Sequence, residues 1–254
     1  MSYNYSDISL NEYPGQISLV ISFRGCKFYC PYCFNPELTQ FKELSFKQVK
    51  DAIDEHIGFI DAVVLTGGEP LHHKNLDKII SYCKAKKLKV KLNTNGFISH
   101  IQSPYQPLFM KVDYLNISLK DPMYCIYPKG FIYNYLVYGQ ILEYSMVYSP
   151  TLYPTSVLNT YVNKIKESIL QDEWKIKENI LQDKWSIPDI FTINQMQVGN
   201  CYNPEFNNIK VPTREELKEV ALLFKDLPCK KIMIETTSHG KEVIYSKRKS
   251  HELR

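Results

Sequence analysis

Hydrophobic and polar positions alternate along the chain in short runs, and most runs are followed by a stretch with helical spacing of apolar residues. Strands that alternate with amphipathic helices predict repeated β-α units around a parallel sheet. We therefore expect an α/β fold. The six predicted strands are Ile17–Phe23, Ala62–Leu65, Leu88–Leu92, Val112–Leu119, Glu143–Ser149 and Ile190–Met196.

Two capping boxes mark the starts of predicted helices. Ser45 with Gln48 precedes a helix whose inward face ends at Ile57, and Thr213 with Glu216 opens a helix near the C-terminus. A further helix is predicted by the inward face that Leu76, Ile79, Ile80 and Cys83 share, and a short last strand is predicted at Lys231–Glu235.

An 11-residue tandem repeat occupies residues 164–185, with copies that begin at Lys164 and Lys175. Eleven residues make about three helical turns, so the second copy extends a helix and keeps its apolar stripe on one side. We predict a lengthened helix between the fifth and sixth strands. Burial against the sheet explains such a stripe, and a face that docks a partner is the alternative. The stripe comprises Ile165, Ile169, Ile176 and Ile180.

Length and composition fit one globular domain. The chain has 254 residues, 44% of them hydrophobic, which predicts a single domain over 1–254 with a core at about 12–200 and a C-terminal helix and short strand in 201–254. Its net charge of +4 is too small and dispersed to indicate nucleic acid. Since the sequence has neither a long apolar run nor a signal-peptide pattern, we expect a cytoplasmic protein with no membrane partner.

Cys26, Cys30 and Cys33 form the spacing C-x3-C-x2-C. Iron–sulfur cubanes normally use one thiolate for each iron, so three cysteines leave one iron open for another ligand. Structural zinc sites usually have four ligands in paired units, and no second pair or suitably spaced His-x3-His follows. A [4Fe–4S] cluster is therefore the favoured hypothesis, with structural zinc or three ordinary core cysteines as the alternatives.

Further candidate residues follow the other predicted strands. Because the C-terminal strand ends of a β/α barrel form its active site, we expect these segments to lie close together. Taken alone, the glycine segment is more often a plain turn, and a lysine is more often exposed. The segments are Thr66-Gly67-Gly68-Glu69-Pro70, Thr94-Asn95-Gly96 and Lys120-Asp121.

The cysteine spacing, with Tyr32 before the last cysteine, resembles the signature of radical S-adenosylmethionine (SAM) enzymes. The resemblance implies a partial (β/α)6 TIM-like barrel in which SAM binds the open iron and yields a 5′-deoxyadenosyl radical. It implies that Glu69 holds the amino group of SAM while Gly67 and Gly68 admit it. It also implies roles for residues that would contact the adenine, the ribose or the carboxylate, or lie beside them: Tyr32, Thr66, Pro70, Thr94, Asn95, Ser118 and Lys120.

A longer string, from Glu12-Tyr13-Pro14-Gly15 to Asn35-Pro36-Glu37-Leu38, resembles the activases of glycyl radical enzymes, above all those of anaerobic ribonucleoside-triphosphate reductases. The resemblance implies such a reductase as partner and a flavodoxin- or ferredoxin-type electron donor. Two positions depart from the pattern: Phe34 replaces a histidine, and Ser118 replaces the aspartate of some activases.

The leading hypothesis is therefore an activase that removes a hydrogen atom from one backbone glycine of its partner, for which no protein general base is needed. The first alternative keeps the radical chemistry and changes the substrate to a small molecule, as in 7-carboxy-7-deazaguanine synthases. The second alternative is a non-catalytic module in which the three cysteines hold zinc.

Overall fold

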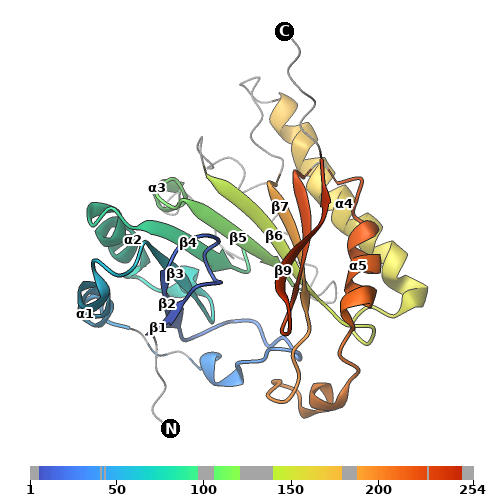
Figure 1. The fold of residues 1–254 in the computed structure, drawn as a ribbon, viewed down its shortest axis with the longest axis horizontal. Coiled ribbons are helices and arrows are strands. Elements are labelled where there is room, and N and C mark those ends of the chain that lie inside the picture. The colour runs from blue at the N-terminus through green and yellow to red at the C-terminus, as the bar shows by residue number, and fades with distance from the viewer. Residues whose placement is uncertain are drawn as a thin grey trace.

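The computed structural model describes residues 6–40, 42, 44–96, 106–120, 140–178, 188–227 and 229–247, without the side chains of 106, 107 and 168–178. These residues form one nine-stranded sheet whose strands follow one another in chain order (Figure 1). The strands are β1 (Ser6–Ser9), β2 (Ser18–Phe23), β3 (Ala62–Gly67), β4 (Lys89–Thr94), β5 (Tyr114–Leu119), β6 (Ile141–Tyr148), β7 (Ile190–Gln195), β8 (Lys231–Thr236) and β9 (Gly240–Ser246).

Strands β2 to β8 are parallel, and β1 and β9 pair antiparallel at the two edges. In the part of the chain described, β1 and β9 are not paired with each other, so the sheet is not a closed barrel. The six predicted strands correspond to β2–β7, and the predicted last strand is β8. The expectation of an incomplete α/β barrel is therefore confirmed.

The sequence analysis missed both edge strands. β1 has four residues, none of them buried, and β9 is likewise exposed or half-buried along its length. An edge strand needs less apolar surface than a central one, so its hydrophobic signal is weak. The C-terminal part therefore adds a hairpin, β8 and β9, to the sheet rather than a single short strand.

Both predicted capping boxes are present, at Ser45 and at Thr213. The first helix ends at His56, one residue earlier than its predicted inward face, and Ile57 is 43% exposed; placing Ile57 in the core was wrong. The helices are α1 (Phe46–His56), α2 (Leu76–Ala85), α3 (Gln106–Phe109), α4 (Thr155–Glu178) and α5 (Arg214–Leu222).

The tandem repeat begins inside α4, which lies between β6 and β7 as predicted. The helix contains the whole first copy and residues 175–178 of the second, and Ile165 is buried in the core. The side chains of Ile169 and Ile176 lie outside the described part, as does residue Ile180.

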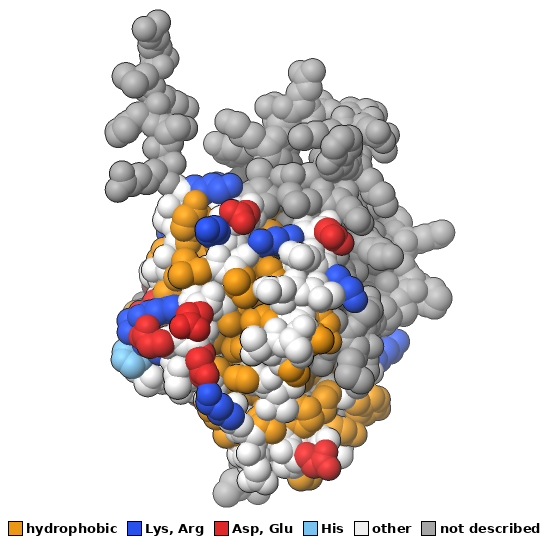
Figure 2. Space-filling model, turned by 90° about the vertical axis from the view of Figure 1, so that its right-hand side faces the viewer, with side chains coloured by type: hydrophobic (Ala, Val, Ile, Leu, Met, Phe, Trp, Pro, Cys, Tyr) orange, Lys and Arg blue, Asp and Glu red, His pale blue; other side chains and the backbone are white. Residues whose placement is uncertain are grey.

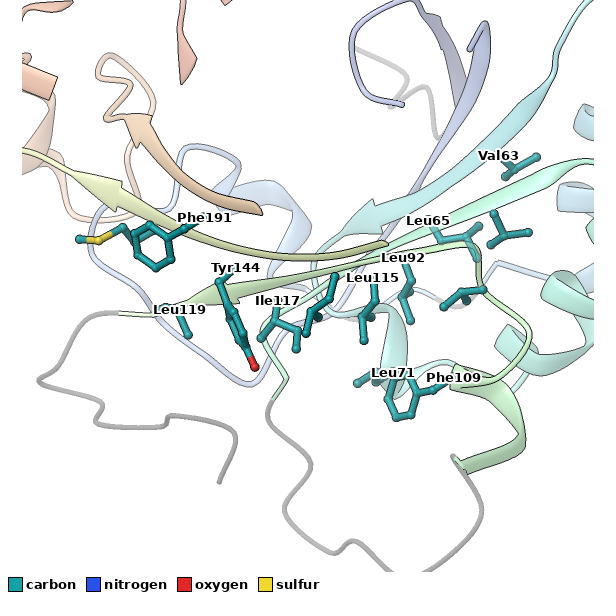
Figure 3. Packing of buried hydrophobic residues seen from close by; sticks show 14 of the residues in the cluster. Val63, Leu65, Leu71, Leu92, Phe109, Leu115, Ile117, Leu119, Tyr144 and Phe191 are labelled. Carbon is teal, nitrogen blue, oxygen red and sulfur yellow. The ribbon is translucent and has the colours of Figure 1, made fainter. Parts of the chain in front are cut away.

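The main core lies between the helices and the outer face of the sheet. Alternate residues of neighbouring strands point to this face, for example Leu65 of β3, Leu92 of β4 and Leu115 of β5 (Figure 3). All three side chains are fully buried. The other residues of each strand face inward, and this inner face is more polar.

A buried charged network fills the inner face of the sheet near the N-terminal ends of its strands. Lys91 is 1% exposed, and its Nζ donates to the Glu12 carbonyl at 2.8 Å and lies 3.8 Å from Glu143 Oε2. The Tyr114 hydroxyl donates to the same carboxylate at 2.8 Å, and the Thr192 hydroxyl donates to its other oxygen. Burial lowers the pKa of Lys91, while Glu143 opposes that shift. The network joins strands β4 to β7 and leaves space between it and the C-terminal ends of the strands.

No helix of the described chain is long and apolar enough to cross a membrane. On the face shown in Figure 2, basic and acidic side chains are interspersed among hydrophobic and uncharged ones. This distribution agrees with the mild net charge.

Two glycines allow the turn after β3 to lie directly against the turn after β2. Gly68 N–H donates to the Phe23 carbonyl and Glu69 N–H donates to the Gly25 carbonyl, each at 2.8 Å. A Cβ on Gly67 would lie 2.3 Å from the Phe23 oxygen, and one on Gly68 would lie 2.5 Å from the Gly25 oxygen. Only glycine fits this contact, which fixes the start of the cysteine loop.

We expect Gly67→Ala to lower the free energy of unfolding by at least about 3 kcal/mol, because it adds both a backbone collision and strain at φ +108°. Gly58→Ala is the matched control, since Gly58 has φ +90° but nothing within 4 Å of an added Cβ. The control should cost only about 1 kcal/mol. Urea denaturation measures both values, and equal losses would show that the close contact is unimportant.

Candidate active site

The cysteine loop follows β2 and is held by backbone hydrogen bonds at both ends. Gly25 N–H donates to the Leu38 carbonyl at 2.7 Å, and Cys26 N–H donates to the Thr39 carbonyl at 3.2 Å. Between them, Cys33 N–H donates to the Cys30 carbonyl at 2.9 Å. Hydrogen bonds within residues 25–39 therefore hold the cysteine loop in place.

A distant segment of the chain also supports this loop. Tyr202 N–H donates to the Cys33 carbonyl, and Asn203 N–H donates to the Pro31 carbonyl, each at 2.9 Å. Cys201 is buried and packs with Cys30 and Tyr32 beside the loop. Cys83 and Cys229 lie in the main core, and Cys125 falls outside the described residues.

The three cysteines line one cavity of about 1090 Å³ together with the ends of several strands. Its volume slightly exceeds the usual range of about 300–1,000 Å³ for ligand sites, so it has space for more than one bound group. The predicted site residues that line it are Cys26, Cys30, Tyr32, Cys33, Thr66, Gly67, Gly68, Thr94, Asn95, Ser118 and Lys120.

The thiols of Cys26 and Cys30 lie in a partly buried, locally charged setting. Burial raises the pKa of both thiols. A hydrogen bond from Phe28 N–H opposes the shift at Cys26, and Lys120 opposes it at both cysteines. Lys120 Nζ also donates to Ser118 Oγ at 3.0 Å, which fixes a cation at this end of the cavity. A nearby cation favours the thiolate forms that bind iron.

Asn95 connects the loop after β4 to the cysteine loop. It is 7% exposed, and its side-chain amide lies 3.9 Å from Cys26 Sγ as a donor. The resemblance to radical SAM enzymes placed Asn95 near SAM; the structure adds a contact with a proposed cluster ligand. Hydrogen bonds to ligand sulfurs are one of the ways in which proteins set the potential of an iron–sulfur cluster.

Glu69 is completely buried and does not line the cavity. One carboxylate oxygen accepts from Leu71 N–H at 3.0 Å and from Thr94 Oγ1 at 2.7 Å, and the other accepts from Asn95 N–H at 2.8 Å. Burial raises the pKa of Glu69, and these three hydrogen bonds oppose the shift. The carboxylate thus joins the turn after β3 to the turn after β4. Pro70, also buried, begins the short helix that follows and likewise lies outside the lining.

The residues fit an iron–sulfur cluster with an open iron. Among the described residues, no three His, Cys, Asp or Glu side chains converge as ligands of a single ion. A cubane does not require such convergence, because each thiolate binds a different iron. Three cysteines, a cation and a glycine turn that line the same large cavity suit a cluster and a polar cofactor bound beside it.

Three further residues that line the cavity were missed by the sequence analysis. They could have been found from the alternation of inward and outward side chains along the strands. Asn93, Asn116 and Asn194 also line the cavity, from β4, β5 and β7. Each lies inside a strand rather than in the loop after it, so the search for motifs at strand ends passed over them. Their alternation with buried apolar residues was the available signal.

Comparison with known proteins agrees with this geometry. Residues 20–123 match the family described as the radical SAM superfamily. A Methanocaldococcus jannaschii protein assigned as a glycyl-radical enzyme activating enzyme is 27% identical over 226 residues, covering 86% of this chain and 89% of that protein. The 7-carboxy-7-deazaguanine synthase of Aquifex aeolicus is 34% identical over 83 residues, covering 30% of this chain and 32% of that enzyme.

The fold is also similar to a solved structure of SuiB from Streptococcus suis bound to S-adenosylmethionine. The TM-score is 0.54 at 15% identity, with 85% of this chain and 51% of SuiB covered. This chain therefore spans about half the length of SuiB, and the likeness concerns the fold. The family match includes the cysteine loop, most of β2 and the strands β3 to β5, so residues 20–123 have the sequence of a radical SAM domain, a family whose members use a [4Fe–4S] cluster and SAM.

Proposed function

We propose that this radical SAM enzyme is an activase that generates a glycyl radical on a partner enzyme. The observation that carries the proposal is the extent of the similarity to the assigned activating enzyme, which covers 86% of this chain and 89% of the relative. The similarity to the deazaguanine synthase covers 30% and 32%, so it does not extend beyond a part of each chain.

In this proposal the chain's own residues bind and orient the reacting groups. Cys26, Cys30 and Cys33 would hold the cluster, and Gly67 and Gly68 would let the amino acid part of SAM approach the backbone. Thr94 and Asn95, fixed by Glu69, would line the other side of the same pocket. Lys120 and Ser118 provide a cation and a hydroxyl where a carboxylate could bind. When bound beside these residues, the cluster and SAM would supply a carbon radical able to take a hydrogen atom.

The open sheet supports a protein substrate. The cavity is bordered by residues from the segment between β1 and β2 and by the turn between β8 and β9, so it reaches the surface between the two edge strands. A glycine on a partner's loop needs such an opening. We propose an anaerobic ribonucleoside-triphosphate reductase as the partner and a flavodoxin- or ferredoxin-type protein as the electron donor, from the resemblance of the cysteine region to those activases.

Cys30→Ala should abolish assembly of the cluster, because it removes one of three thiolates. Anaerobic reconstitution followed by iron and sulfide analysis and visible absorbance measures the outcome. Cys83→Ala is the matched control, since Cys83 is fully buried in the main core and should retain the cluster. Full iron content in the Cys30 variant would contradict the ligand assignment.

Glu69→Ala should spare the cluster and weaken SAM binding by roughly tenfold or more, because it leaves the Asn95 N–H and the Thr94 hydroxyl without their acceptor. Equilibrium dialysis with labelled SAM gives the dissociation constant. Glu69→Gln retains one carbonyl acceptor and should fall between the wild type and the alanine variant. An unchanged dissociation constant in Glu69→Ala would remove Glu69 from the site.

The activase reaction is tested with the reconstituted, reduced protein, SAM and the candidate reductase. We expect 5′-deoxyadenosine by chromatography and a glycyl radical by electron paramagnetic resonance, both dependent on SAM. 5′-Deoxyadenosine without a protein radical, together with turnover of a tetrahydropterin, would favour the small-molecule alternative. A reduced cluster that yields no 5′-deoxyadenosine would overturn the enzymatic proposal.

A further inference from the structure

The sulfur of Cys26 accepts hydrogen bonds from two separate segments of the chain. Within the cysteine loop, Phe28 N–H donates to Cys26 Sγ at 3.4 Å. From the turn after β4, the side-chain amide of Asn95 donates to the same sulfur at 3.9 Å, a distance that the larger radius of sulfur allows. The first contact is local, whereas the second joins positions 69 residues apart and exists only in the folded protein.

Glu69 holds both ends of the contact between Asn95 and Cys26. Its main-chain N–H donates to the carbonyl of Gly25, the residue before Cys26, at 2.8 Å. Its carboxylate accepts from the main-chain N–H of Asn95, also at 2.8 Å. One buried residue therefore sets the distance between the strand end that carries Asn95 and the loop that carries Cys26.

The turn that carries Asn95 is closed by further hydrogen bonds. Thr94 Oγ1 donates to the Glu69 carboxylate at 2.7 Å and accepts from Gly96 N–H at 3.0 Å. Thr94, Asn95 and Glu69 are all buried. Because the backbone on both sides of Asn95 is fixed, its amide stays directed toward the cysteine loop without the help of a bound cofactor.

An N–H donor beside a ligand sulfur favours the reduced form of an iron–sulfur cluster. Reduction adds one electron, and the thiolate sulfurs carry part of the added negative charge. Hydrogen bonds to these sulfurs stabilise that charge and raise the reduction potential. The electrostatic effect is larger where water is excluded, and the side chain of Asn95 is almost completely shielded from solvent.

We infer that Asn95, acting through the sulfur of Cys26, raises the reduction potential of the cluster. Asn95 is thus a positioning residue that determines how readily an electron enters the site. This role differs from the place beside SAM that the family resemblance implies for Asn95. The inference needs Cys26 as a cluster ligand but does not depend on the activase proposal, because it concerns the cluster and not the substrate.

The test is a redox titration of the reconstituted protein without SAM and without a partner, with the reduced fraction measured by electron paramagnetic resonance. Asn95→Leu removes the donor at nearly constant volume, and Asn95→Ala removes it without added bulk. In both variants the ratio of reduced to oxidised cluster at a fixed potential should fall by about tenfold, a shift of about 59 mV for a one-electron couple. Asn159→Leu, at an exposed position on α4, is the matched control and should titrate as the wild type.

A second measurement detects the contact itself. Wild-type protein is prepared with asparagine that carries ¹⁵N in its side-chain amide, and pulsed electron paramagnetic resonance is recorded on the reduced cluster. We expect a ¹⁵N coupling that disappears in the labelled Asn95→Ala protein. The main-chain nitrogen of Phe28 is not labelled and does not contribute to this signal.

An unchanged potential in both Asn95 variants would overturn the inference, as would an equal fall in Asn159→Leu. It would also be overturned if the Asn95 variants lost affinity for SAM in equilibrium dialysis while keeping the wild-type potential, since Asn95 would then act on the cofactor alone. Should neither variant assemble a cluster, the labelled wild type decides, because the absence of a ¹⁵N coupling contradicts the contact. A normal shift in potential without a glycyl radical in the activase assay contradicts only the proposed function.

Discussion

The contact between two backbone turns, residues 23–25 and 67–69, is the constraint on which the site depends. It brings the beginning of the cysteine loop against the end of β3 through two hydrogen bonds of 2.8 Å. The approach is close enough that an added Cβ on Gly67 or Gly68 would collide with backbone oxygens. Glu69, the next residue, then extends the connection to Thr94 and Asn95 after β4. Three strand ends are thus held in one arrangement before any cofactor binds, which reduces the entropy lost on binding.

The inner face of the sheet explains why a cavity exists at all. Closed β/α barrels fill their interior with layers of large branched side chains. Here the inner positions near the strand ends are small or polar, such as Ser118, Ser145 and Thr66, and the sheet stays open between β1 and β9. Large inner side chains occur lower down, where Tyr114, Lys91 and Glu143 form a closed and hydrogen-bonded floor. The outer face of the sheet packs against the helices in the continuous apolar core, which stabilises the fold. The inner face of the same strands lines the cavity.

This division of the strands gives the proposed chemistry its physical basis. The cysteines, Lys120 and the glycine turn line one cavity together with polar inner residues of the neighbouring strands. A hydrogen-abstracting cofactor and a substrate loop would meet in this cavity. Similarity along most of the chain to an assigned activating enzyme supports this proposal, and the open side of the sheet supplies the access that a protein substrate requires.

The sequence by itself determined the parallel strands, the two helix caps and the cysteine spacing. Period-two and helical repeats of apolar residues are local signals, and they remain readable because buried faces of strands and helices must be apolar. The edge strands β1 and β9 escaped this reading, since half-exposed strands carry little of that signal.

Only the tertiary structure decided how the polar residues are used. Glu69 accepts hydrogen bonds from residues 25 and 26 positions further along the chain, and the Asn95 amide reaches Cys26 across 69 positions. Asn93 and Asn116 lie side by side, and line one cavity with Asn194, only because the sheet's register brings their strands together. Such contacts depend on the direction of each side chain and on distances between strands remote in sequence, and a local pattern contains neither.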